Sequence, residues 1–429
     1  MCNAFPDAEQ GVQVWRPGSP PQTRRSRSTR RFSTQFRRPG MSVFLSIIAV
    51  LPLVIAAYAY VVYPAVLWTI SRIHGKARPT PRITSWPKVT VTVPVYNSEL
   101  SIRATLEHLL EVDYDRDKLQ ILVISDASTD RTDEIVREYG TRGVELLRLP
   151  ERRGKTAAEN AALAASRGEI LVNVDSTILV PRNSLKKLVR VFDDPTIGVA
   201  SGRDVSKGAG GDSTLTESRY VGYEMHVRDL ESRVGSIVGA SGCFYASRRS
   251  VHALPLPPGL SWDFAAALKA RIQGLRSVSV QDATCIVPRA AQIRTELTRK
   301  SRTMARGLST LFHYRALMNP FEHGGFALML ISHKLLRWLP YLLLPFAFAA
   351  LCLLATENSQ ARIAVAAVTT FVIVGYAAIR QRNAKLSRPF ALAGFVVAVF
   401  SAGFLAWLTA VRQTQLATWE PTPRPEIQA

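Results

Sequence analysis

Two carboxylates lie at the ends of apolar runs and a lysine lies at a predicted helix start between them, positions where ligand-binding groups are expected. The run "ILVNVDSTILVP" (170–181) carries one carboxylate, Asp175, directly after its β-branched stretch, and "LQILVISD" ends in the same way on Asp126. Between them, "RRGKTAAEN" places Lys155 at a predicted helix start, where free backbone N–H groups favour anions. Two carboxylates and a cation that follow successive strands suit a nucleotide diphosphate with a divalent metal.

A further set of polar residues closes the first predicted strand, "KVTVTVPVYN". This set comprises Pro94, Tyr96, Asn97 and Glu99. Each charged residue also has a structural alternative, because Asp126 and Asp175 could form turns and Lys155 could be a solvated side chain. Their order on successive strand ends favours a binding site, since ligands of open α/β sheets bind at that edge.

A fourth charged residue, Asp263, lies in "SWDFAAALKARIQG". An apolar stripe at helical spacing follows it, and Gly274 is a stop signal, so Asp263 falls in the first turn of a helix. The stripe consists of Phe264, Ala267, Leu268 and Ile272. A carboxylate there can offset the helix dipole, a contribution of ~0.3–1 kcal/mol, or it can accept a proton in catalysis.

These residues lie in a soluble-type region, 89–310, that alternates strand and helix patterns. The strand candidates are "KVTVTVPVYN", "LQILVISD", "VELLRLP", "EILVNVD" and "IGVASGRD", and helices are predicted to begin near Ser98, Thr132, Lys155 and Asn183. This alternation predicts an α/β fold with a mainly parallel sheet covered on both faces.

Long apolar segments flank that region. The chain has 429 residues and a net charge of +21, yet its mean hydropathy is slightly positive, so apolar and polar stretches must be segregated. One uncharged run before the domain and three apolar runs after it are long enough to be transmembrane helices. They cover 41–70, 338–355, 361–379 and 390–411. The region 311–337 carries His333, Lys334 and Arg337 among apolar residues, which predicts an amphipathic helix at the membrane surface.

Charge patterning predicts the orientation of these segments. The loop 380–388 has four basic residues and no acidic one, which places it and the domain in the cytoplasm of an inner-membrane protein. The segments 1–40, with eight arginines, and 412–429 are predicted tails, and 71–88 is a linker. This orientation places the basic tail outside the cell, whereas basic segments prefer the cytoplasmic side. A start at Met41 would remove the conflict. N-terminal sequencing tests that hypothesis.

The charge distribution and the cysteine spacing argue against a nucleic-acid partner and against cysteine-based sites. The basic residues cluster in the tail and at membrane edges, which argues against a nucleic-acid partner. The four cysteines lie far apart without C-x-x-C spacing, so neither a zinc site nor a disulfide framework is indicated.

The ordered motifs "VTVPVYNSE", "VISDASTD", "RRGKTAAEN", "ILVNVDST" and "SWDFAAALKARIQG" resemble those of family 2 glycosyltransferases with the GT-A fold. The flanking spans resemble those of membrane-embedded members such as cellulose, hyaluronan and poly-N-acetylglucosamine synthases. The resemblance implies that Pro94, Tyr96, Asn97, Glu99, Asp126 and Lys155 border the nucleotide. It further implies that Asp175 faces the metal, Mg²⁺ or Mn²⁺, and that Asp263 is the catalytic base.

Two further segments follow from the resemblance. "GASGCFYASRR" (239–249) matches the small-residue segment at the acceptor site, with Gly239, Ser241 and Gly242. Arg299 and Arg302 match the cationic part of the Q-x-x-R-W pattern and would clamp the diphosphate, or they would meet anionic lipid as an interfacial helix.

The chain departs from the family pattern at three positions. Thr303 stands where processive synthases have tryptophan, Trp262 replaces one acid of a pair before the base, and Thr177 replaces the second metal-binding aspartate. One carboxylate can still hold a metal whose other ligands are diphosphate oxygens and water. If the metal binds tightly without donor, Asp204 is the candidate for a second protein ligand.

The predicted function is inverting transfer of a sugar from a UDP-sugar to a membrane-associated saccharide, in cell-surface polysaccharide synthesis. One alternative is transfer of a single sugar to a polyprenyl-phosphate or other lipid-linked acceptor. Another is a non-catalytic membrane protein that binds a nucleotide. Since four spans form only a modest path through the bilayer, export of a polymer would need a partner.

Overall fold

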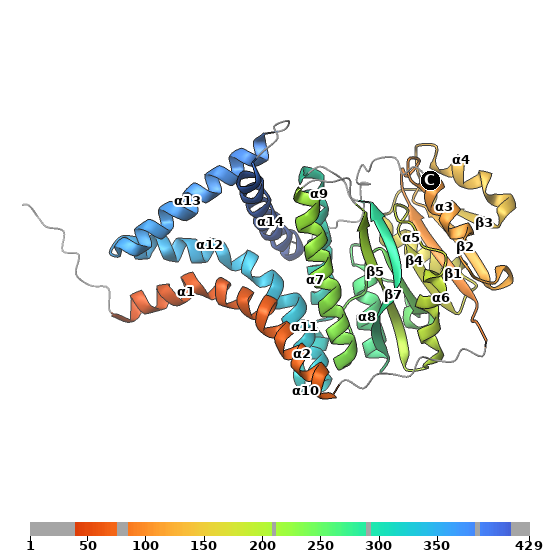
Figure 1. Cartoon of the computed structure of the whole chain (residues 1–429), viewed down its shortest axis with the longest axis horizontal. Coiled ribbons are helices and arrows are strands. Elements are labelled where there is room, and N and C mark those ends of the chain that lie inside the picture. The colour runs from red at the N-terminus through yellow and green to blue at the C-terminus, as the bar shows by residue number, and fades with distance from the viewer. Residues whose placement is uncertain (1–38, 75–84, 208–211, 289–292, 382–386, 413–429) are drawn as a thin grey trace, which may run out of the picture.

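The computed structural model describes residues 39–74, 85–207, 212–288, 293–381 and 387–412. An α/β domain occupies one end of the long axis and a group of long helices the other (Figure 1). The predicted tails and much of the predicted linker lie outside the described residues.

A seven-stranded sheet forms the centre of the α/β domain, in the order β3-β2-β1-β4-β6-β5-β7. The strands are β1 (Val89–Val95), β2 (Leu119–Ser125), β3 (Val144–Arg148), β4 (Ile170–Val174), β5 (Ile197–Lys207), β6 (Phe244–Arg248) and β7 (Arg276–Pro288). The first four strands are parallel, β6 is antiparallel to both of its neighbours, and β5 is parallel to β7. The predicted α/β class with a mainly parallel sheet is confirmed.

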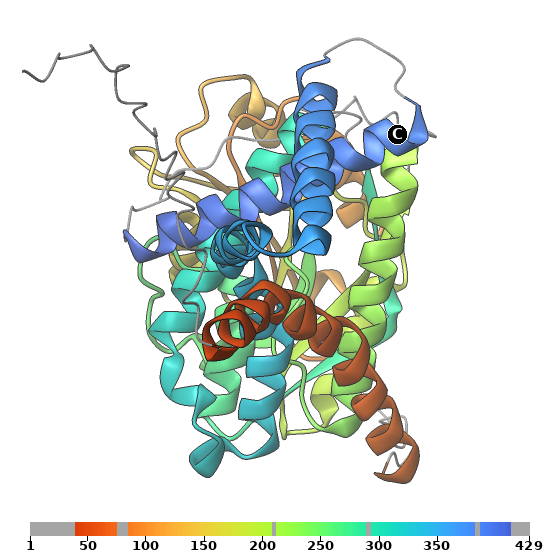
Figure 2. The same cartoon turned by 90° about the vertical axis from the view of Figure 1, so that its left-hand side faces the viewer.

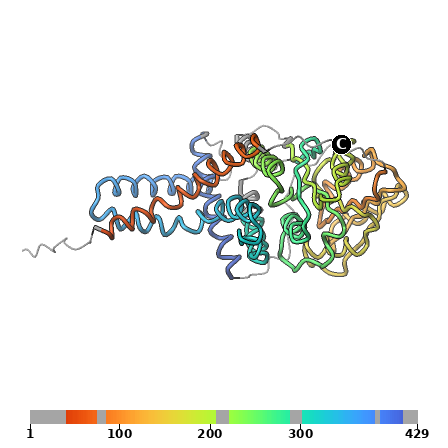
Figure 3. Tube along the Cα trace, turned by 90° about the horizontal axis from the view of Figure 1, so that it is seen from below, coloured from red at the N-terminus to blue at the C-terminus, as the bar shows by residue number. Residues whose placement is uncertain are grey.

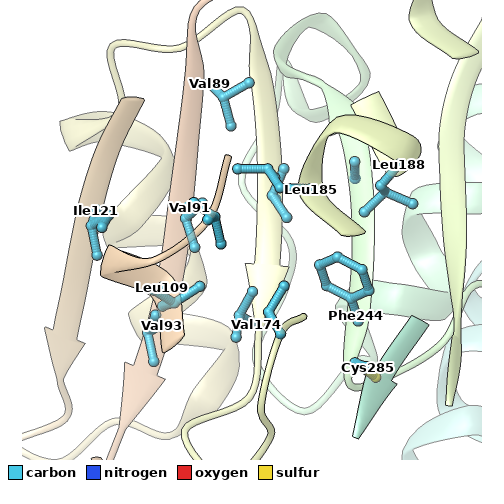
Figure 4. Packing of buried hydrophobic residues seen from close by; sticks show 14 of the residues in the cluster. Val89, Val91, Val93, Leu109, Ile121, Val174, Leu185, Leu188, Phe244 and Cys285 are labelled. Atoms are coloured by element: carbon cyan, nitrogen blue, oxygen red, sulfur yellow. The ribbon is translucent and has the colours of Figure 1, made fainter. Parts of the chain in front are cut away.

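Helices cover both faces of this sheet because its strands bury alternate side chains on opposite sides. In β2, Ile121 and Val123 pack into the main core, whereas Leu122 and Ile124 pack against the other face. The first face carries α3 (Ile102–Leu110), α4 (Thr132–Glu138) and α6 (Ser184–Val189), and the second carries α5 (Lys155–Ala165) and α8 (Trp262–Ile272). Figure 4 shows the first of these layers, with Leu109 and Leu185 over the strands.

The five predicted strands and the four helix starts agree with the structure to within a few residues. The helix predicted over 262–272 is also present, and Gly274 follows it with φ +75°. One member of its predicted stripe differs, because Ile272 at the helix end is 58% exposed. The strands β6 and β7 were not predicted as strands, since β6 follows directly on a Gly/Ser-rich loop and β7 lacks strict alternation.

The long helices agree with the predicted spans. Helix α1 (Pro39–Ala57) continues through a π-turn (Tyr58–Val62) into α2 (Tyr63–His74), and α12 (Leu336–Ala355), α13 (Ser359–Arg380) and α14 (Arg388–Val411) follow the domain. Four helices of the described chain are long and apolar enough to cross a membrane. Seen from their own side and from below, α1, α12 and α13 run side by side away from the domain (Figures 2 and 3).

Two long helices stand between the membrane helices and the sheet, α7 (Asp212–Val234) and α9 (Ile293–His313) (Figure 1). Short helices α10 (Pro320–His323) and α11 (Gly325–Leu330) follow, and a second π-turn (Ile331–Leu335) leads into α12. The structure differs here from the predicted surface helix over 311–337. The helix from Gly325 runs on as one candidate span to Ala355, and His333 and Arg337 are buried against α7 rather than facing outward.

Candidate functional site

The loops at the carboxyl ends of β1 and β2 are joined to each other by hydrogen bonds. Asn97 adopts a left-handed backbone, φ +47°, and its side chain bonds to Thr129 in the second loop. Glu99 accepts a bond from the Arg131 N–H at 3.2 Å, and the Glu99 N–H donates to Asp130. The predicted nucleotide-facing residues Asn97 and Glu99 therefore lie together and stabilise this corner of the sheet edge.

Pro94 and Tyr96 have distinct positions on β1. Pro94 lies beyond Thr92, where the pairing of β1 with β4 ends, so the ladder on that side needs no N–H from it. Tyr96 is buried, and the guanidinium carbon of Arg152 lies 3.8 Å from its ring centroid. This cation–π pair brings a cation to the carboxyl edge of the sheet, where the nucleotide is predicted to bind, and the sequence analysis had not selected Arg152.

Asp126 is fully buried at the end of β2. Its two oxygens accept the N–H groups of Arg153 and Gly154 at 2.7 and 2.8 Å. Since Gly154 has φ +88°, the chain turns there into α5 with its N–H directed at the carboxylate. Asp126 thus fixes the loop that carries Lys155.

Lys155 and Asp175 form the central ion pair of the site. The lysine Nζ lies 2.6 Å from Asp175 Oδ1 and 4.0 Å from Glu159 Oε1. Burial alone would lower the pKa of Lys155, but the nearby carboxylates outweigh it and raise that pKa above its ordinary value. The lysine is therefore a fixed positive charge at the sheet edge.

Arg306, from α9, is a second cation of this centre that the sequence analysis had not selected. Its guanidinium donates to Thr156 Oγ1 at 2.6 Å and to the Leu260 carbonyl at 2.9 Å. Burial lowers the pKa of Arg306 below its ordinary value, and the nearby carboxylates Glu159 and Asp263 offset only part of that effect. The signal that could have identified it is its position four residues after Arg302, which itself follows Arg299 by three, so that the three arginines share one helical face.

Glu159 belongs to the same group. Its side chain is only 3% exposed, against 28% for Asp175. Burial, opposed by Lys155 and Arg306 and assisted by Asp263 and Asp175, raises its pKa to about 8. Three carboxylates and two cations meet here, and a proton on the most buried acid balances the charge.

Asp263, the predicted base, lies in the first turn of α8 beside the predicted acceptor loop. Its Oδ1 accepts a hydrogen bond from Ser261 Oγ at 2.6 Å. A Cβ on Gly242 would lie 3.4 Å from Asp263 Oδ2. The absence of a side chain at Gly242, which is exposed, leaves this carboxylate oxygen accessible.

The loop 238–243 is anchored on both sides. The Ser241 hydroxyl donates to Asp204 Oδ1 at 2.7 Å, and the Ser241 backbone N–H donates to Ser201 Oγ at 2.8 Å. The Cys243 carbonyl accepts the Asp175 N–H. Asp204, the candidate second metal ligand, therefore holds the predicted acceptor loop through Ser241. A Cβ on the buried Gly239 would lie 3.5 Å from Lys334 Nζ, so this end of the loop touches the start of the membrane helices.

A buried ion cluster connects that loop to the membrane helices. His333 lies 2.6 Å from Glu231 and 2.9 Å from Glu224, and Arg337 lies 2.6 Å from Glu224. Burial would raise the pKa of Glu224, but the charges of His333, Arg337 and Lys334 hold it well below its usual range. The second oxygen of Glu231 accepts the Val238 N–H, so the cluster also holds the loop.

Trp262, which replaces an acid of the family pattern, points away from the site. It is 3% exposed and stacks on His252 with ring centroids 4.2 Å apart. Burial lowers the pKa of His252 to about 3, so the imidazole is neutral. A carboxylate at this position would be buried in an apolar layer.

The predicted diphosphate clamp is only partly described. Arg299 lies in α9 with its side chain outside the described residues, and Arg302 is half-buried in the same helix. Thr303 is exposed. Arg306, one turn further along α9, contacts α5 through Thr156.

A divalent metal fits this centre only with help from a ligand. The described residues contain no group of three His, Cys, Asp or Glu side chains that could hold a metal ion. Asp175 can offer one carboxylate, so diphosphate oxygens and water would have to complete a six-fold oxygen shell.

Comparison with known proteins finds relatives of the α/β domain. Residues 90–253 match the family model Glycosyl transferase family 2. An N-acetylglucosaminyltransferase of Rhizobium sp. (strain N33) is 31% identical over 173 residues, which cover 38% of each chain. A beta-monoglucosyldiacylglycerol synthase of Synechocystis is 31% identical over 117 residues, which cover 26% of this chain and 24% of that protein. The chain thus spans well under half the length of these relatives.

One solved structure is similar over nearly its whole length. It is the mannosyltransferase PcManGT from Pyrobaculum calidifontis in complex with GDP-Man and Mn²⁺, with a TM-score of 0.65 and 25% identity. The similarity covers 86% of this chain and 99% of that one, and therefore includes membrane helices as well as the α/β domain.

Proposed function

We propose that the chain carries a family 2 glycosyltransferase domain and that it transfers a sugar, with inversion, from a nucleotide-diphosphate donor to a membrane-associated saccharide acceptor. The observation that carries the proposal is the grouping of Asp175, Lys155 and Asp263 at one sheet edge, beside a loop of small residues. The expected setting is cell-surface polysaccharide synthesis at the inner membrane, with the domain in the cytoplasm.

Each charged group has a role in this reaction. Asp263 removes the proton from the acceptor hydroxyl as that oxygen attacks the anomeric carbon, and a single base on the acceptor side suits direct displacement with inversion. Gly242 leaves room for the acceptor to approach Asp263. Lys155 and Arg306 stabilise the negative charge that develops on the departing diphosphate.

On the donor side, the nucleotide would lie against Tyr96, Arg152 and the loop that Asp126 fixes. A UDP-sugar is the expected donor, although the mannosyltransferase named above binds GDP-Man. Asp175 would hold Mg²⁺ or Mn²⁺ together with the donor, and the metal would supply further positive charge to the diphosphate. Protein without donor is therefore expected to bind Mn²⁺ weakly.

A second acceptor class is favoured by one observation. Thr303 is exposed at the position where processive synthases of the resembling group carry a stacking tryptophan. Transfer of one sugar to a polyprenyl-phosphate or other lipid-linked acceptor needs no such platform. If the product is instead a polymer, its export requires a partner beyond the four spans.

The test is a panel of labelled nucleotide sugars given to membranes that contain wild-type protein, Asp263→Asn or the control Asp117→Asn. Asp117 is exposed at the amino end of β2, the opposite edge from the site. Loss of the base is expected to lower kcat by about 10²–10⁴ without a change in donor affinity, and the control is expected to keep full activity.

Turnover that survives Asp263→Asn would overturn the assignment of the base. Donor binding without turnover by the wild type over the whole panel would favour a non-catalytic nucleotide-binding protein. The product distinguishes the two acceptor classes, since a polymerase yields long chains and a single transfer yields a lipid that carries one sugar.

A further inference from the structure

A cavity lies outside the proposed catalytic centre, where the first membrane helix meets the α/β domain. It has a volume of about 390 Å³, and its walls come from α2, α7, β5 and β7. A volume of this size is within the range of small-molecule sites.

Positive charge dominates the walls of this cavity. Arg72, Arg203 and Arg233 line it, against one carboxylate, Asp229. Arg233 pairs with Asp229 at 2.7 Å, whereas Arg72 and Arg203 have no ion-pair partner among the residues that the structure describes. Two exposed guanidinium groups are thus available to an anion, and guanidinium pairs with phosphate oxygens in a bidentate manner.

The cavity is separate from the catalytic centre because neighbouring side chains of a strand point to opposite faces. Asp204 in β5 accepts the Ser241 hydroxyl of the acceptor loop. Arg203, the preceding residue, lines the cavity instead. On that side α7 covers β7, where the Ser279 N–H donates to Ser232 Oγ at 3.0 Å.

The cavity also has an apolar side that fits the edge of a bilayer. The first candidate span ends at Ile73, next to Arg72, and Trp68 one turn earlier is 50% exposed. The guanidinium of Arg72 lies 5.2 Å from the Trp68 ring centroid. Tryptophan and arginine at the end of a span are typical of the headgroup level of a membrane, and the buried Met225 and Leu230 add apolar wall.

We propose that this cavity binds the phosphate of an anionic phospholipid headgroup, held by Arg72 and Arg203, with the glycerol backbone of the lipid against Trp68. A soluble phosphate ester shares the charged part of this chemistry. It lacks the acyl chains that would remain in the bilayer beside the span, so the position of the cavity at a span end favours the lipid.

The experiment measures binding of short-chain phosphatidylglycerol to the full-length protein in a neutral detergent. Phosphatidylcholine of the same chain length and glycerol 3-phosphate are the comparison ligands. The variant Arg72→Gln/Arg203→Gln tests the two arginines. The control Arg137→Gln removes an exposed arginine of α4, in the part of the domain far from the membrane helices (Figure 1).

We expect wild type and Arg137→Gln to bind phosphatidylglycerol more tightly than phosphatidylcholine. The double variant should lose at least tenfold in affinity, since one hydrogen bond to a charged group is worth about that factor. Equal affinity of the double variant and the control overturns the site. Binding of glycerol 3-phosphate as tight as that of the lipid overturns the assignment to a lipid headgroup.

Discussion

The buried acid Glu159 provides a test of the charge balance in the proposed catalytic centre. Replacing it by glutamine keeps the size of the protonated side chain and removes its ability to ionise. In the folded protein the pKa of Glu159 is raised from its ordinary 4.5 to about 8, chiefly by burial. The wild-type side chain is therefore protonated in the folded state and ionised in the unfolded state between these two values.

The sign and size of the effect follow from this difference. Because the folded state holds a proton that the unfolded state releases, the contribution of Glu159 to stability is complete below pH 4.5 and is lost as the pH rises to about 8. Each pH unit in this window is worth ~1.4 kcal/mol, so the loss is on the order of 5 kcal/mol. For a chain of this size that corresponds to roughly 10 °C in melting temperature.

The assay is thermal unfolding of the full-length protein in detergent at a series of pH values from 5 to 9. The melting temperature of Glu159→Gln is expected to rise relative to that of wild type as the pH increases to 8, and to keep a constant difference above it. The control Glu134→Gln removes a carboxylate that is 65% exposed on α4 and should follow wild type. If the curves of Glu159→Gln and wild type stay parallel from pH 5 to 9, the proton does not reside on Glu159.

Two further changes probe the predicted acceptor loop and the ion cluster that holds it. Gly242→Ala places a methyl group 3.4 Å from Asp263 Oδ2, so the KM for acceptor should rise about tenfold while donor binding is unchanged. The control Gly140→Ala, which has open space around it, should leave both constants unchanged. An unchanged acceptor KM in Gly242→Ala would show that the acceptor binds elsewhere. His333→Gln leaves two buried glutamates without their shared partner and should cost about 3–5 kcal/mol, seen as a lower melting temperature in detergent. The half-exposed pair His323–Glu322 supplies the control, His323→Gln, and equal melting temperatures of the two variants would contradict a stabilising role for the cluster.

The sequence predicted the elements of the fold whose signals are local. The β-branched runs that became β1 to β5, the start of α5 at Lys155 and the uncharged run of the first span all depend on neighbouring residues. The strand β6 was missed because its five residues follow a Gly/Ser-rich loop and pair antiparallel with β4 and β5, contacts that no local pattern specifies.

Part of the site could be predicted for the same reason. Asp126, Asp175 and Asp263 follow strands or begin a helix, and the order of such ends along a parallel sheet places them at one edge. Arg306 and Glu159 could not be identified in this way, because each lies inside a helix, and its importance depends on which neighbouring element it faces. Similarly, the charges of His333 and Arg337 suggested a surface helix until their partners on α7 were known.

The sequence by itself thus determined the α/β class, the four apolar spans and the polar residues at the strand ends, since periodicity and chain order are local properties. Only the tertiary structure decided how charges are paired across the chain. Lys155 meets Asp175, 20 positions away, Arg306 meets Thr156, and His333 meets Glu231. Burial and distance decide which acid holds a proton and which cation faces a ligand, and both are set by the packing of helices that are remote in sequence.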